Sequence, residues 1–115
     1  MPHPPPPPVP QRLREILKDY PEHLDRLQEA LNDYVRKPFK LMPFDGATWA
    51  LEGRLETFCL EADEEARAAE ASGDVDELAR KKAKAQQMSR ACWKQVWISD
   101  DGLREYFSQH KDAFL

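Results

Sequence analysis

Glycine, long apolar runs and strand-forming segments are all scarce in this sequence. Only four of its 115 residues are glycine, and no run of β-branched residues marks a strand. No apolar run approaches the ~20 residues that a membrane-spanning helix needs. Alanine-rich segments and 33% charged residues are present instead. This composition predicts an all-α protein with a single domain and no membrane segment.

Recognisable motifs for catalysis, metal binding or nucleotide binding are lacking as well. There is no Glu-x-x-His or His-x-x-x-His spacing for a metal site, and no glycine-rich loop for a phosphate group. The two cysteines, Cys59 and Cys92, are not placed by their spacing beside a histidine that could activate them. We therefore expect no enzyme activity, no metal and no cofactor. We expect both cysteines to be reduced, buried thiols, with a disulfide as the alternative.

An excess of positive charge is missing too. The net charge is -4, which gives no general attraction to nucleic acid or to an anionic membrane. The N-terminal segment has neither the basic stretch nor the apolar stretch of a secretory signal. We therefore expect a cytoplasmic protein.

The stretch 46–98 has the pattern of two long helices joined by the tight break 72–74. Gly73 can end the first helix in a left-handed conformation, and Asp74 with Glu77 can form a capping box for the second. If the arms pair antiparallel, as in a coiled coil, apolar residues meet wherever two residue numbers sum to about 147. The predicted pairs include Leu51 with Val96, Leu55 with Cys92, Cys59 with Met88 and Ala62 with Ala85. The sequence therefore predicts a long antiparallel helical hairpin.

Charge and side-chain size are both segregated along this hairpin. The first arm and the turn carry ten acidic residues, whereas the second arm carries six basic residues and, after Glu77, no acid. The register predicts the ion pairs Glu65–Lys82 and Asp63–Lys84, each worth about 0.2–1 kcal/mol. Alanine gathers near the turn, and the large aromatic residues at the open end are Phe44, Trp49, Phe58, Trp93 and Trp97. We expect the core at the open end and a thinly packed projection at the turn.

The remaining segments are expected to pack on the open end of the hairpin. Residues 1–10 are interpreted as a proline-rich, flexible leader, and residues 11–115 as a single helical domain. Short helices are predicted before the hairpin and after Asp100. The connector 38–45 is apolar, so it either wraps across the base as part of the core or forms an exposed partner site. Asp45 is the predicted N-cap of the first arm.

These patterns favour a non-enzymatic helical protein that binds or regulates another protein, and a second copy of the chain is one partner to consider. The leader offers a P-x-x-P-x-R docking spacing, the connector offers apolar side chains, and the second arm offers a basic face. The alternatives are weak nucleic-acid binding through that basic face and a small enzyme with an unrecognised site. The candidate partner-binding residues are Pro7, Pro10, Arg12, Phe39, Leu41, Met42, Arg80, Lys81 and Lys84.

Overall fold

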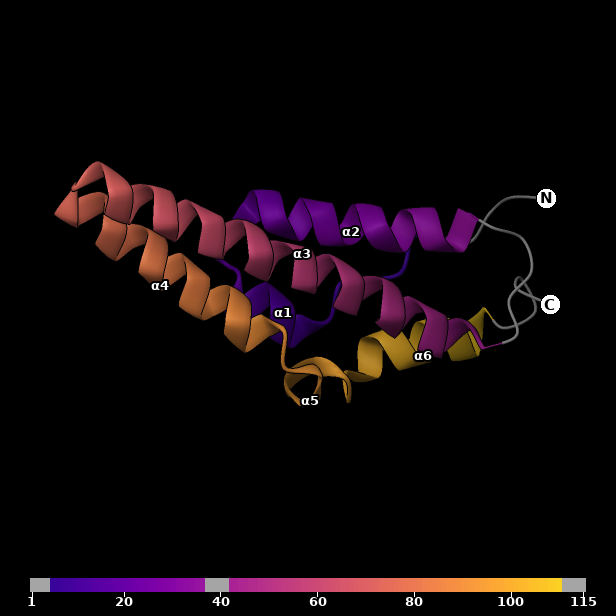
Figure 1. The fold of residues 1–115 in the computed structure, drawn as a ribbon. Coiled ribbons are helices and arrows are strands. Elements are labelled where there is room, and N and C mark those ends of the chain that lie inside the picture. The colour runs from indigo at the N-terminus through magenta and orange to yellow at the C-terminus, as the bar shows by residue number, and fades with distance from the viewer. Residues whose placement is uncertain (1–4, 37–41, 111–115) are drawn as a thin grey trace.

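Helices make up all the regular structure in the part of the chain that the computed structural model describes, residues 5–36 and 42–110. They are α1 (Gln11–Ile16), α2 (Pro21–Arg36), α3 (Pro43–Ser72), α4 (Val75–Ala91), α5 (Lys94–Trp97) and α6 (Asp101–Gln109). Helices α3 and α4 form a long antiparallel hairpin, and the shorter helices gather around its open end (Figure 1). The molecule measures 55 × 22 × 20 Å. The predicted all-α fold is confirmed.

The turn of the hairpin lies at the predicted break. Gly73 adopts a left-handed conformation, with φ 77° and ψ 7°, and ends α3. The Asp74 carboxylate accepts a hydrogen bond of 3.0 Å from the Glu77 backbone N–H and so caps α4. The chain reverses tightly because a left-handed glycine ends one helix directly before the residue that caps the next.

The two arms also face each other in the predicted register. The Cys92 thiol donates a hydrogen bond of 3.2 Å to the Leu55 carbonyl oxygen. Nearer the open end, Lys94 Nζ lies 3.1 Å from Glu52 Oε1. Both contacts join residues whose numbers sum to 146 or 147, which matches the expected pairing.

The predicted ion pairs near the tip were wrong in detail. Glu65 pairs with Lys84 at 2.9 Å and more loosely with Lys81 at 4.0 Å, whereas Lys82 and Asp63 are exposed. Lys81 and Lys84 are one turn apart on the side of α4 that faces α3. Lys82 points about 200° away from Lys84 around the helix axis, so it cannot reach Glu65. Pairing residues whose numbers sum to about 147 predicted the register of the two arms. It did not predict the direction in which each side chain points around its helix.

The first arm begins earlier than the predicted residue 46. Pro43 occupies the first helical position of α3, where its missing N–H is not needed, and Met42 is the N-cap. Asp45 therefore lies in the first turn of α3 instead of capping it. Its negative charge is still favourable there, because the N-terminal end of a helix carries partial positive charge.

The second arm ends at Ala91, before the predicted residue 98. Trp93 has an extended backbone, with φ -76° and ψ 100°, and the chain then turns into the short helix α5. The Trp97 indole N–H donates a hydrogen bond of 2.9 Å to the Ala91 carbonyl oxygen. This bond satisfies a carbonyl that the end of α4 leaves without a helical partner, and it stabilises the break.

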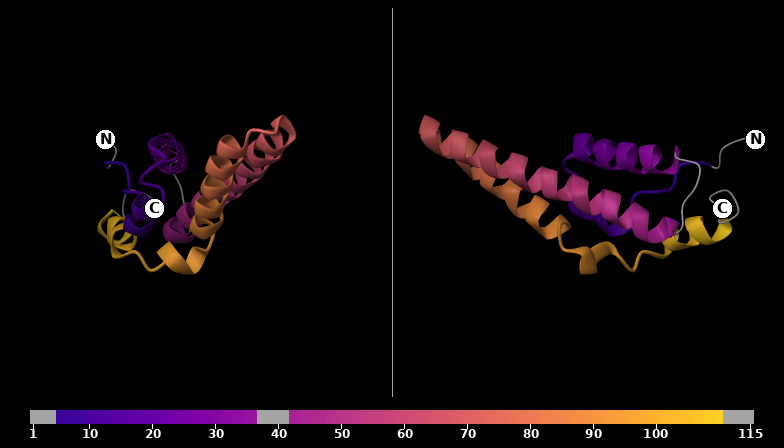
Figure 2. Two further views of the ribbon diagram at one scale, coloured as in Figure 1. Left: turned by 90° about the vertical axis from the view of Figure 1, so that its left-hand side faces the viewer. Right: turned by 45° about the vertical axis from the view of Figure 1, so that its right-hand side comes forward.

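Helices α1, α2 and α6 cover one side of the hairpin. In the left view of Figure 2, α3 and α4 lie on one side of the molecule and these three helices lie on the other. Arg26 of α2 and Glu61 of α3 join the two layers through hydrogen bonds of 2.7 and 2.9 Å. The core between the layers consists mainly of side chains with almost no exposure: Leu13, Leu17, Leu27, Leu31, Leu51, Leu55, Phe58, Met88, Trp97 and Leu103. The opposite side of the hairpin has no such cover in the described chain.

The described part of the proline-rich leader is packed against the body. Three of the residues 5–10 are buried, and the Pro7 carbonyl oxygen accepts a hydrogen bond of 2.8 Å from the Gln28 side chain. At its end, the Gln11 backbone N–H donates a hydrogen bond of 2.9 Å to the Asp100 carboxylate. This segment is therefore an ordered strap where it is described; residues 1–4 lie outside the described ranges.

The expected aromatic core at the open end is only partly formed. Phe58 and Trp97 are buried and Phe44 is half-buried, whereas Trp49 and Trp93 are 62% and 68% exposed. Trp49 lies on the side of α3 away from the buried stripe, and Trp93 follows the break after α4. Neither side chain can reach the layer formed by α1 and α2, so the prediction for these two residues was wrong.

Alanine substitutions at two glycines of α3 should change the stability of the fold in opposite directions. A Cβ atom at Gly46 would lie 2.0 Å from the Tyr34 hydroxyl oxygen, whereas a Cβ atom at Gly53 would meet no atom within 4 Å. Gly53→Ala should stabilise the fold by about 0.5–1 kcal/mol through helix propensity. Gly46→Ala should destabilise it by about 1–3 kcal/mol, because the Tyr34 ring must move. Urea unfolding followed by circular dichroism measures both, and a stabilising Gly46→Ala would contradict this packing of α2 on α3.

Candidate partner-binding face

Within residues 5–36 and 42–110, the large apolar side chains that are left exposed belong to the hairpin helices or to residues directly beside them. Their exposed fractions are 56% for Met42, 62% for Trp49, 68% for Leu60, 78% for Val75 and 68% for Trp93. Helices α1, α2 and α6 have no comparable residue within the described ranges. One exposed apolar residue needs no explanation, but several on the same side of a molecule mark a binding surface.

Three of these residues lie along one line of α3. Trp49 follows Met42 by seven residues, about two helical turns, and Leu60 follows Trp49 by eleven, about three turns. Gly53 and Glu56 lie between them and are exposed. This line runs along the side of α3 opposite its buried stripe.

The other two residues lie at the two ends of α4: Val75 is its first residue, and Trp93 follows its C-cap. Trp93 follows Val75 by eighteen residues, about five helical turns, and exposed Lys82 and Gln86 lie on the line between them. Within α4, buried Met88 points about 200° away from exposed Gln86, toward the core. The exposed line of α4 therefore also points away from the body.

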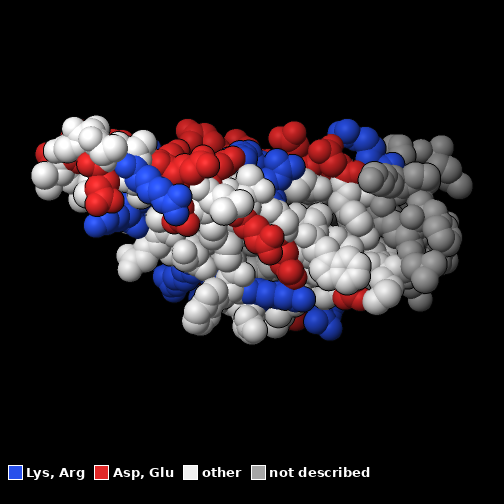
Figure 3. Space-filling view, viewed as in Figure 1, with Lys and Arg blue, Asp and Glu red and all other residues white. Residues whose placement is uncertain are grey.

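A salt bridge shows that the two lines belong to one surface. Glu52, which pairs with Lys94, is three residues after Trp49, and Lys94 directly follows Trp93. We call this surface the open face; its residues are Met42, Trp49, Gly53, Glu56, Leu60, Asp63, Val75, Lys82, Gln86, Ser89, Arg90 and Trp93. Figure 3 views the molecule as in Figure 1 and shows uncharged side chains over much of the hairpin, crossed by acidic side chains near the middle, with further acidic side chains along the top and basic ones below.

Charge on the open face is divided between its two helices. Glu56 and Asp63 lie on α3, Lys82 and Arg90 lie on α4, and all four are exposed. Within the described chain, none of these four side chains takes part in a hydrogen bond or salt bridge. Exposed Arg67 lies five turns after Trp49 on the α3 line, nearer the tip, so the α3 edge is acidic from Glu56 to Asp63, opposite the basic residues of α4.

Neither the packing nor the backbone conformation of the single chain requires glycine at position 53. An exposed glycine inside a helix costs about 0.5–1 kcal/mol relative to alanine, and a Cβ atom here would meet no atom within 4 Å. The residue lies one turn from Trp49, so it leaves a gap in the side-chain layer of the open face. A large ring or a second helix could approach the α3 backbone closely at this point.

The P-x-x-P-x-R motif predicted from the sequence does not have its prolines exposed for binding to another domain. Pro7 and Pro10 are buried, and Arg12 lies in α1, where it pairs with Glu15 at 3.3 Å. A proline-binding domain would need the prolines and the arginine along one exposed edge.

The other predicted residues are distributed between two sides of the molecule. Met42 lies on the open face, and Phe39 and Leu41 lie outside the described residues. The three basic candidates, Arg80, Lys81 and Lys84, form salt bridges with acidic residues of the hairpin. With Tyr20 they line a shallow hollow between the second arm and the body.

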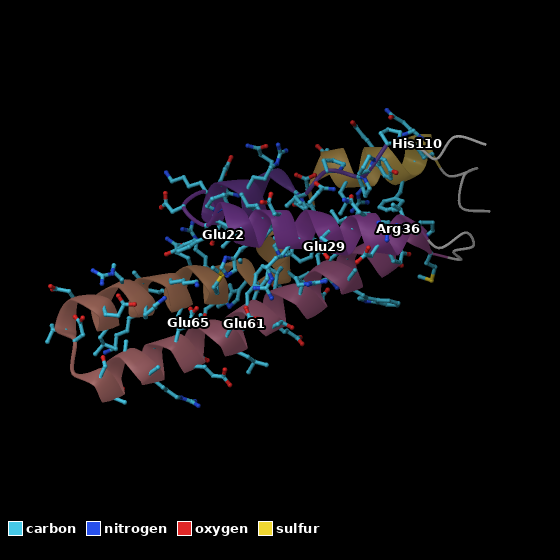
Figure 4. All side chains as sticks on the ribbon, turned by 90° about the horizontal axis from the view of Figure 1, so that it is seen from above. Glu22, Glu29, Arg36, Glu61, Glu65 and His110 are labelled. Atoms are coloured by element: carbon cyan, nitrogen blue, oxygen red, sulfur yellow. The ribbon has the colours of Figure 1, made fainter. Side chains whose placement is uncertain are left out.

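The acidic partners of these cations come from both arms of the hairpin. Arg80 contacts Glu77 within α4, and Lys84 reaches across to Glu65 of α3. Figure 4 shows Glu61 and Glu65 on the same stretch of α3. The positive charge predicted to form a basic face is therefore largely compensated within the chain.

His23 is the buried ionisable residue beside that hollow. It is 6% exposed, and its ring meets the Phe58 ring edge-on with centroids 4.7 Å apart. Burial, and then the positive charges of Lys84 and Arg26, lower the pKa of His23. Its Nδ1 atom has no hydrogen-bond partner among the described residues. The geometry makes His23 a neutral packing residue.

The two cysteines are free thiols on the facing sides of the hairpin arms. Burial, and then the neighbouring Cys59 thiol, raise the pKa of Cys92 to about 12. A thiol with so high a pKa carries almost no thiolate at neutral pH, so it is a poor nucleophile and a poor metal ligand. Within the described residues there is no group of three or more side chains suited to holding a metal ion, and no helix long and apolar enough to cross a membrane.

Comparison with known proteins adds no relative to this description. No family model, no curated protein and no solved structure matches the chain. The open face therefore has to be interpreted from its own residues. Of the residues of the open face, Met42 is among the partner-binding candidates predicted from the sequence, whereas Trp49, Gly53, Leu60 and Trp93 are not. Their positions off the buried stripe of each arm were the signal that could have identified them.

Lowering the pH should destabilise the protein through His23. The unfolded chain binds this proton near pH 6.5 and the folded chain only at lower pH, so the free energy of unfolding falls as the pH drops below about 6.5. His23→Phe, which keeps a ring against Phe58, should lose less stability over the same interval. Urea unfolding at about pH 7.5, 6.5 and 5.5 measures this, and equal losses in both proteins would contradict a neutral, buried His23.

Cys92 should resist alkylation in the folded protein. With its pKa raised to about 12, its reaction with iodoacetamide near pH 8 should be at least about tenfold slower than in the urea-unfolded chain. Peptide mass spectrometry over time separates Cys92 from Cys59. Equal rates for Cys92 in the folded and unfolded chains would show that its thiol is not held between the two arms.

Proposed function

We propose that this protein is a non-enzymatic helical interaction module that binds another protein through the open face. The observation that carries the proposal is the placement of the five exposed large apolar residues of the described chain on the uncovered side of one hairpin. Within the described chain, the large apolar residues of α1, α2 and α6 are at least partly buried. In a protein whose other helices are packed this well, an exposed apolar surface supports the interpretation as a binding site.

The composition of the open face supports a protein partner. Tryptophan and methionine are enriched where proteins bind each other, and a tryptophan can bury about 150–250 Å². Trp49 is three residues before Glu52 and Trp93 directly precedes Lys94, the two residues of an ion pair that joins α3 to the start of α5. We expect these two rings to contribute most of the binding energy and the surrounding charges to select the partner.

The alternative of nucleic-acid binding has less support. Lys81 and Lys84 are compensated by Glu65 and Glu77, and the chain carries a net charge of -4. Of the basic residues of α4 in the described chain, this leaves Lys82 and Arg90 without a salt bridge, and two cations are few for contacts along a phosphate backbone. We place the module in the cytoplasm, where two unpaired cysteines are kept reduced.

Site-specific photocrosslinking in living cells of the source organism tests the proposal. A photoreactive phenylalanine analogue replaces Trp49 in one variant and Leu60 in a second. Both residues lie on the open face and make no contact that the core requires. We expect covalent products with protein from both positions, and we expect Trp93→Ala to reduce the yield at least about fivefold, because a central tryptophan contributes about 2 kcal/mol or more to a typical interface.

A matched control places the same analogue at Asp25, which is exposed on α2. No product is expected there. Products of equal yield from all three positions, products with nucleic acid alone, or no product at all would contradict the open face as a protein-binding surface. Mass spectrometry of each product identifies the bound chain.

A further inference from the structure

We propose that the partner of the open face is a second copy of this chain, placed so that the tips of both hairpins lie at the same end. Helix α3 of each copy then runs along α4 of the other. This inference rests on the proposed function and adds the identity and orientation of the partner. It is carried by the division of charge on the open face, by the register of the hairpin and by the gap at Gly53.

The charges select between two ways of placing one open face on another. A two-fold axis across the hairpin would set α3 on α3 and bring Glu56 and Asp63 of both copies together. A two-fold axis along the hairpin sets α3 on α4 of the partner copy, so these acidic residues meet Lys82 and Arg90. Like charges in contact oppose association and opposite charges favour it. The second arrangement is therefore the self-complementary one.

The register inside the hairpin also fixes the contacts between copies. Rotation about an axis along the hairpin leaves each residue at the same position along its length. Residues that meet across the two copies therefore again have numbers that sum to about 147, as within one hairpin. The resulting contacts are Glu56 with Arg90, Asp63 with Lys82, and Gly53 with Trp93.

The contact of Trp93 with Gly53 accounts for both residues. Trp93 is 68% exposed in the single chain, and Gly53 leaves open space above the α3 backbone. The indole ring of one copy can lie flat over the glycine of the other, twice in a symmetric pair. A side chain at position 53 would hold the two helices apart. The exposed tryptophan and the destabilising glycine are thus two halves of one contact.

The size of the face fits a specific dimer. The 17 residues of α4 span about 25 Å, and two adjacent helices make a surface about 20 Å wide. Pairing over this area buries on the order of 1,000 Å² in total, to which the exposed parts of four tryptophans add up to about 100–160 Å² each. The sum reaches the ~1,200–2,000 Å² of a typical specific interface. The product is an antiparallel four-helix arrangement in which every neighbouring pair of helices runs in opposite directions.

Light scattering over a concentration series gives the first test. We expect the wild-type chain to form a dimer, and we expect Gly53→Gln to raise the dissociation constant at least about tenfold. Gly53→Gln does not threaten the fold, because position 53 is open and glutamine is the better helix former. Circular dichroism should therefore show unchanged helix content. Asp25→Gln, on the exposed side of α2, is the control and should leave the dissociation constant unchanged.

Charge reversal gives the second test and fixes the orientation. Asp63→Lys and Lys82→Asp, each alone, place like charges at both ends of the symmetric contact and should each raise the dissociation constant at least about tenfold. A mixture of the two variants should form a heterodimer as tight as the wild-type dimer. In that heterodimer one contact joins the two substituted positions, which again carry opposite charges, and the other joins an unchanged Asp63 to an unchanged Lys82. A dimer with α3 on α3 would give the opposite result for Asp63→Lys alone, because the new lysine would meet Glu56 of the other copy and the dissociation constant would fall.

The outcomes separate this inference from the proposed function. A wild-type monomer at every concentration overturns the inference, and so does a dimer that ignores both Gly53→Gln and the charge reversals. If the photocrosslinked products then contain a different protein, the open face is still a binding surface with another partner. If no protein product forms either, both proposals fail.

Discussion

Burial of one side of α3 is the constraint on which the rest of the structure depends. This helix has 30 residues, and its contacts with α2, α4 and α6 all draw on the same side. Packing, more than helix propensity, stabilises a helix in a protein. Because its neighbours share one side of α3, the opposite side is left to solvent along the whole length of the helix. The exposed tryptophan, leucine and glycine of the open face all follow from that asymmetry.

The hairpin could be predicted from the sequence because its determinants are local. Gly73 and Asp74 set the turn, and the register then follows from counting residues along two regular helices. The open face could not be predicted in the same way. Trp49 was grouped with Trp97 because both are large aromatic residues, yet Trp49 lies about 160° around the helix from Leu51. Which side of a helix is covered depends on where α1 and α2 dock, and no local pattern encodes that position.

The basic residues of α4 illustrate the same limit. As a sequence they form one group opposite an acidic arm, and the pairing of the arms follows from that opposition. In three dimensions they divide into two sets. Lys81 and Lys84 point inward to Glu65 and Glu77, whereas Lys82 and Arg90 point to solvent. The first set fixes the arms in register within the chain; in the proposed dimer the second set fixes one chain against the next.

Asp100 connects the two ends of the described chain. One of its carboxylate oxygens accepts a hydrogen bond from the Leu103 backbone N–H at the start of α6, and the other accepts from the Gln11 backbone N–H at the start of α1. Helix α1 has only six residues, too few to persist by itself. During synthesis α1 therefore lacks this anchor until Asp100 has left the ribosome, which happens only after helices α2 to α5 have been made.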